Sequence, residues 1–149
     1  MNTRSMIKGV LDHGAMPALE RMIVFTAHRQ KVLTHNIANL STPNFRPIDL
    51  DPDMFQEQLG RAIDHRRRSR KPLDGDLNLR STRQVEERHG RLSFDAAESN
   101  QGILYHDRNN RDLERTMQSL AENNLTHNLS IDLLKSEFDL LRAAIRERP

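Results

Sequence analysis

Histidine is the residue type in this sequence that most readily suggests metal chemistry, because seven histidines are present and cysteine is absent. A metal site on a helix needs ligands three or four residues apart, as in the His-Glu-x-x-His pattern. No two histidines have that spacing: they stand at His13, His28, His35, His65, His89, His106 and His127. The sequence therefore predicts no metal site, and the absence of cysteine excludes a thiolate zinc site and a disulfide scaffold.

Catalytic and cofactor-binding patterns are missing as well. The sequence has no glycine-rich phosphate loop, no Gly-x-Ser-x-Gly elbow and no pair of carboxylates in an apolar setting that would shift a pKa. Aromatic residues make up 4% of the chain and tryptophan is absent, so a deep pocket lined by rings is not expected. We therefore expect a protein that is not an enzyme, with no catalytic residues, no cofactor and no small-molecule substrate.

Basic residues are concentrated in one segment. The formal net charge is only +2, yet residues 61–71 hold six Lys or Arg against one Asp. Such a run can bind phosphate backbones through counterion release, so a nucleic-acid-binding module is one alternative. No recognition motif accompanies the run, and Asp74 and Asp76 follow it at once. A solvated loop, or one that meets an acidic protein neighbour, is the simpler interpretation, and no nucleic-acid partner is expected.

Two long stretches free of Gly and Pro predict helices that span about 17–42 and 107–147. Apolar residues recur along both stretches at steps of three and four, which is the spacing of one helix face. In the second stretch these steps average about 3.56 residues, between the coiled-coil and straight-helix periods. We expect the two helices to pack antiparallel along an intrachain seam formed by Leu33, Ile37, Leu120, Ile131, Leu134, Phe138 and Leu141.

The second helix has another apolar face almost opposite that seam, and one partner helix cannot cover both. We expect this second face to contact other subunits, since large exposed apolar patches usually mark interaction sites. The alternative is that the middle of the chain folds back over it. The residues assigned to the intersubunit face are Leu125, Leu129, Leu133 and Leu140.

The middle of the chain, residues 53–106, looks weakly structured. A short amphipathic helix is expected at 53–64, followed from 65 to 91 by a mobile basic loop, because few residues there are apolar. Residues 91–94 and 102–105 are candidates for a weak strand pair. The fold class expected is therefore all-α: a single domain over 1–149 with two long terminal helices in a coiled-coil-like hairpin and a mobile, partly β middle segment.

The end of the first helix is the most distinctive segment. Pro43 disfavours the helical conformation for Thr42 and so ends the helix. Asn44 follows where the chain must turn, and Asn tolerates the left-handed conformation better than most residues. Phe45 can then fold back as an apolar anchor. The segment predicts a helix stop with a fixed exit direction.

This segment resembles the signature of the bacterial flagellar axial family of rod and hook proteins. In that signature Ala-Asn, two residues, Thr-Pro, Gly or Asn, an aromatic and a basic residue stand in this order, as they do from Ala38 to Arg46. Residues 107–114, 120–125, 133–138 and 141–145 are similar to the carboxy-terminal region of flagellar basal-body proximal rod proteins. The positions that carry the family motif are Asn36, Ala38, Asn39, Thr42, Pro43, Asn44, Phe45, Asn123 and Asn124.

The resemblance implies a structural subunit of the rod, the drive shaft of the flagellum, which polymerises with other axial proteins and transmits torque from the inner-membrane ring to the hook. Implied partners are further copies of the chain, other rod subunits, proteins of the rod–ring junction and inner-membrane ring, and the flagellar type III export apparatus. The chain has no run of about 18 apolar residues and no signal-like start. We therefore expect a periplasmic rod location after export without a cleaved signal peptide.

A rival within the same system is a helical export chaperone or adaptor. Such a protein would also show a helical hairpin with exposed apolar surface. It would form a discrete complex with one partner, whereas a rod subunit would enter an axial structure.

Overall fold

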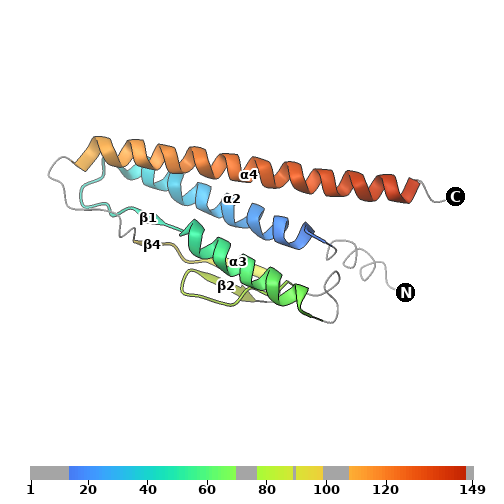
Figure 1. Cartoon of the computed structure of the whole chain (residues 1–149). Helices are drawn as coiled ribbons and strands as arrows, with labels where there is room; N and C mark the ends of the chain where they lie inside the picture. The colour runs from blue at the N-terminus through green and yellow to red at the C-terminus, as the bar shows by residue number, and fades with distance from the viewer. Residues whose placement is uncertain (1–13, 70–76, 89, 99–107, 147–149) are drawn as a thin grey trace.

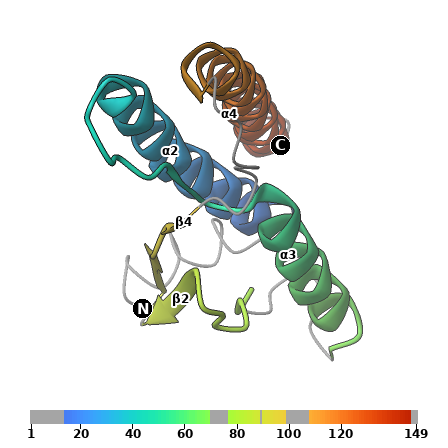
Figure 2. The same cartoon turned by 90° about the vertical axis from the view of Figure 1, so that its left-hand side faces the viewer.

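The computed structural model describes residues 14–69, 77–88, 90–98 and 108–146, with side chains from Leu113 on in the last range. Helices α2 (Met16–Asn39), α3 (Pro52–Arg67) and α4 (Arg108–Arg146) account for most of these residues. Helices α2 and α4 run antiparallel side by side, while α3 and the strands lie on the other side of α2 (Figures 1 and 2). The molecule is therefore layered, with α2 in the middle.

Local sequence signals explain where the helices begin and end. Pro17 lies in the first turn of α2, where its missing N–H leaves no hydrogen bond unmade. Asp51 caps α3, because its carboxylate accepts hydrogen bonds from the backbone N–H groups of Asp53 and Met54 at 2.9 and 3.1 Å. The short helix expected at 53–64 is present as α3, and it continues into the basic run as far as Arg67.

Two small antiparallel sheets show that the all-α prediction is only roughly right. Strand β1 (Ile48–Asp49) pairs with β4 (Ala97–Glu98), and β2 (Val85–Arg88) pairs with β3 (Arg91–Phe94). The strand expected at 91–94 is present, but its partner is 85–88. Residues 102–105, the partner expected from the sequence, lie outside the described residues. The β1–β4 pair brings the end of the middle segment back to the residues that follow α2.

The prediction of a mobile basic loop from 65 to 91 is wrong for part of the described residues, because 65–67 belong to α3 and 85–88 form β2. Leu77, Leu79 and Val85 are only 3–6% exposed and belong to the hydrophobic core. The loop was expected because apolar residues are few there, yet these three point inward and fill a small core. Gly90, at a φ of 74°, directly precedes β3 in a conformation that glycine adopts without strain.

The hydrophobic core lies between α2, α3 and residues 77–88 and 90–96. Phe25 of α2 stacks on Phe55 of α3 with ring centroids 4.1 Å apart, and Phe94 of β3 meets both rings edge-on. Two ion pairs tie the same side of α2 to distant segments: Arg29 binds Asp49 at 2.8 Å, and Arg21 binds Glu87 at 2.8 Å. Among the described residues, none of α4 belongs to this core.

Helix α4 is longer than its partner. With 39 residues against 24, and a rise of 1.5 Å per residue, α4 is about 20 Å longer than α2. Figure 1 shows the C-terminal part of α4 continuing past the Met16 end of α2. Ile145 steps with the seam-facing residues of α4, but its side chain is 72% exposed. The apolar seam of α4 thus continues beyond the contact with α2.

Candidate assembly surface

Asn36 of the family motif fixes the chain that leaves α2. Its side chain is 3% exposed, donates from Nδ2 to the Ile48 carbonyl at 2.6 Å and accepts from the Ile48 N–H at 3.2 Å. One amide side chain therefore satisfies both backbone groups of a β1 residue, as a neighbouring strand would. Arg29 adds a bidentate contact to Asp49, the next residue of β1. Together they hold β1 against α2.

The remaining motif residues of the first segment form the helix stop. Asn39 donates from Nδ2 to the His35 carbonyl at 2.8 Å, and the Thr42 N–H donates to the Asn39 carbonyl at 2.9 Å. Asn44 has a φ of 60°, the left-handed conformation expected from the sequence. Phe45 folds back with its ring edge-on to His35, centroids 5.7 Å apart. Ala38, Thr42, Pro43 and Asn44 are exposed, whereas Asn39 and Phe45 are half-buried.

The assignment of seven residues to an intrachain seam between α2 and α4 remains a prediction, and the structure buries few of these residues completely. Leu33 is 2% exposed. The other seam residues are half-buried: Ile37, Leu120, Ile131, Leu134, Phe138 and Leu141. The fully buried side chains of α4, among those described, are polar: Asn123 at 3% and Ser130 at 5% exposure. The two adjacent asparagines of the motif therefore differ in exposure: Asn123 is buried, whereas Asn124 is half-buried.

Two side chains of α4 form hydrogen bonds with one residue of α2, Thr26. Asn123 Nδ2 donates to the Thr26 carbonyl at 2.9 Å, and His127 Nδ1 lies 2.7 Å from Thr26 Oγ1. Thr26 Oγ1 also donates to the Met22 carbonyl of its own helix at 2.8 Å, and with its one proton used there the Nδ1–H tautomer of His127 is the donor in the contact between the helices. The spacing of Asn123 and His127 places both on one side of α4.

The residues predicted for the intersubunit face form a line along the outside of α4. Leu125, Leu129, Leu133 and Leu140 are 71%, 60%, 47% and 64% exposed. Their spacings of four, four and seven residues keep them on one helix face. No described element covers this leucine line, so the alternative of a middle segment folded over it does not apply to the described residues. Its contact with other subunits remains a prediction.

Comparison with known proteins agrees with the motif resemblance. No family model matches the chain. The flagellar basal body rod protein FlgB of Borrelia hermsii is 30% identical over 122 residues, which cover 79% of this chain and 85% of the relative. The chain belongs to the FlgB family. FlgB of Bacillus subtilis (strain 168) is 24% identical over 142 residues, covering 91% of this chain and 95% of that protein.

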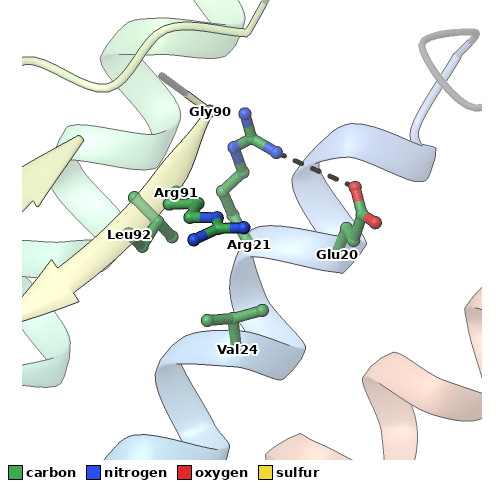
Figure 3. A pocket seen from close by; sticks show the side chains of 6 residues that line it. All are labelled: Glu20, Arg21, Val24, Gly90, Arg91 and Leu92. Carbon is green, nitrogen blue, oxygen red and sulfur yellow. Dashed lines mark ion pairs between the residues drawn. The ribbon is translucent and has the colours of Figure 1, made fainter. Parts of the chain in front are cut away.

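The described part of this FlgB-family chain contains no group of three or more His, Cys, Asp or Glu residues that could hold a metal ion. A hollow of about 310 Å³ lies between α2 and the start of β3 (Figure 3). Its charged lining residues are Glu20, Arg21 and Arg91. Arg21 donates hydrogen bonds to Glu87 and to the Leu77 carbonyl, so its role is to stabilise the fold. The lining includes no nucleophile beside a general base.

The arginines of the basic run at the end of α3 differ in exposure. Arg66 is 6% exposed and donates to the Gly14 carbonyl at 3.2 Å, whereas Arg67 and Arg68 are exposed. Arg70 and Lys71 lie outside the described residues. Because Arg66 is used inside the fold, the described part of the run is not a continuous basic surface for a phosphate backbone. None of the described helices is long and apolar enough to cross a membrane.

Sequence reasoning missed several residues that hold α2 against the elements around it. The contact of the Thr26 hydroxyl with His127 joins two helices that are far apart in the sequence, and no local pattern indicates it. Arg21 and Arg29 were overlooked because their carboxylate partners lie 66 and 20 residues away in the chain. One sequence feature could have indicated the contact with Thr26: Asn123 and His127 are polar residues, four positions apart, on the otherwise apolar face of α4 that is predicted to form the seam.

Proposed function

We propose that this chain is a structural subunit of the flagellar basal-body rod, which polymerises with other axial proteins and transmits torque from the inner-membrane ring to the hook. The observation that carries the proposal is the leucine line on α4, formed by Leu125, Leu129, Leu133 and Leu140, which is exposed over several helical turns. Full burial of one leucine side chain contributes about 1.5–3 kcal/mol. A line of four therefore favours association strongly.

We propose that the leucine line contacts a different surface of the neighbouring subunit and not the leucine line of a second copy, which would close a dimer. A contact between two different surfaces repeats from subunit to subunit and gives a ring, helix or tube. The relatives are named as flagellar basal body rod proteins, which agrees with such an assembly.

Partners and location follow from the same proposal. The leucine line would meet α-helices of neighbouring rod subunits, including further copies of this chain. Proteins of the rod–ring junction and inner-membrane ring would contact the proximal end of the assembly. The chain would reach the periplasmic rod through the flagellar type III export apparatus, without cleavage of a signal peptide. We propose no enzymatic activity.

Deletion of the coding region tests the proposal. Basal bodies purified from the deletion strain are expected to lack a rod in electron micrographs, and a plasmid copy of the gene should restore it. Intact rods in the deletion strain would contradict the proposal. Recovery of the chain only in a discrete complex with one exported protein would favour an export chaperone and also count against a rod subunit.

A further inference from the structure

Helix α4 carries two apolar faces, and hydrophobicity alone does not decide which of them packs on α2. The inner face holds Ile131 and Leu134, which are half-buried, and the outer face holds the leucine line. Both faces offer branched aliphatic side chains at helical spacing. Turning α4 about its axis, or sliding it by one heptad, would therefore leave an apolar contact of similar composition. A further interaction must select the observed arrangement.

Thr26, Asn123 and His127 form the polar contact that can make this selection. Asn123 Nδ2 donates to the Thr26 carbonyl at 2.9 Å, and His127 Nδ1 lies 2.7 Å from Thr26 Oγ1. Thr26 and Asn123 are only 2% and 3% exposed, so their polar groups are shielded from water. Sliding α4 along α2 would separate these atoms and leave the Asn123 amide buried without a partner, which is costly, and turning α4 would break both contacts.

The rest of the interface is poorly suited to this role. Ser130 is the other fully buried described side chain of α4, but its hydroxyl donates to the Thr126 carbonyl of its own helix at 2.7 Å. That bond is kept in any register. The aliphatic seam residues of α4 are half-buried, so their fit against α2 discriminates little between registers. The polar contact at Thr26 is therefore the contact that distinguishes one register of α4 on α2 from another.

We propose that Thr26, Asn123 and His127 act as a register key, which aligns α4 on α2 and keeps the leucine line on the outside. A single polar residue in an apolar helix seam is known to set register at some cost in stability. The inference deepens the proposed function, because it assigns positioning residues to the surface through which subunits would assemble. None of the three needs to contact a neighbouring subunit.

A distance measurement on the isolated protein tests the register key. The chain contains no cysteine, so Lys31→Cys on α2 and Ser136→Cys on α4, both exposed positions, accept spin labels without a background site. Pulsed electron paramagnetic resonance then reports the distance between the labels. The test variants are Asn123→Leu with His127→Leu, and the smaller change Asn123→Ala with Thr26→Val. Asn128→Leu, at an exposed position of α4, is the matched control.

The labelled parent and the Asn128→Leu control are expected to give one narrow distance. Both key variants should add a second population or shift the distance by up to about 10 Å, the rise of seven helical residues, while circular dichroism shows retained helicity. An unchanged single distance in both key variants would overturn the proposal. A loss of helicity without a new distance would also overturn it, because the contact would then stabilise α4 without selecting its register.

The measurement is independent of assembly, so the two proposals can fail separately. If the distance shifts in the key variants but these variants still build normal rods, the register key stands and the assignment of the leucine line to assembly fails. If the distance does not shift while disruption of the leucine line abolishes rods, the register key fails and the proposed function stands.

Discussion

Replacement of Leu129 by glutamate is expected to abolish rod assembly while leaving the isolated protein folded. Leu129 is 60% exposed and lies in the middle of the leucine line, so the fold gains little from it. In a subunit contact the new carboxylate would be buried without a partner, which costs several kcal/mol, and the burial of a leucine would be lost. Complementation of a deletion strain, followed by electron microscopy of basal bodies, measures the effect.

Helicity and thermal unfolding of the purified Leu129→Glu protein should match those of the parent. Asn128→Glu is the matched control, because it adds the same charge at the neighbouring exposed position but outside the leucine line. This control is expected to support rod assembly. An equal loss of helicity and assembly in Leu129→Glu would refute the division between an inner face that folds the chain and an outer face that assembles it.

Replacement of Phe25 by alanine is expected to reduce the free energy of unfolding by about 3–5 kcal/mol, the usual cost of removing a large buried aromatic side chain. Phe25 is 2% exposed, stacks on Phe55 and meets Phe94 edge-on. Such a loss is a large fraction of the stability of a small domain. Urea unfolding followed by circular dichroism measures it.

The loss should also extend to α4, although α4 contributes no described residue to the core. Helix α4 packs on α2, and Phe25 is the fully buried residue that α2 contributes to the core cluster. Val24→Ala, at a position that is 37% exposed, is the control and should change the free energy of unfolding by less than about 1 kcal/mol. Similar effects of the two substitutions would show that the aromatic cluster does not hold the fold.

The long helices and the helix stop were accessible from the sequence because their signals are local. Proline positions and three- to four-residue periodicity placed α2 and α4 within a few residues of their observed ends. The left-handed conformation of Asn44 followed from its residue type and from the need for a turn after Pro43. Asn36 was identified only as a motif residue, since its contact with Ile48 depends on how the chain returns along α2.

The core and the packing of the middle segment could not be predicted from the sequence in the same way. Phe25 does not stand out in the sequence, because α2 is buried on two faces and Phe25 lies on the face turned away from α4. The segment from 65 to 91 contains few apolar residues, so its average composition does not indicate that Leu77, Leu79 and Val85 are all buried. The partners of Arg21 and Arg29 come from distant segments, and no local pattern indicates them.

We propose that neighbouring subunits cover the outer face of α4 in the rod. Thiol reactivity of a Leu129→Cys variant tests it most directly, because the parent chain contains no cysteine. A maleimide reagent should label this thiol rapidly in the isolated protein, where the leucine line is exposed. In intact basal bodies the same thiol should be protected from labelling. Equally rapid labelling in both states would contradict the account.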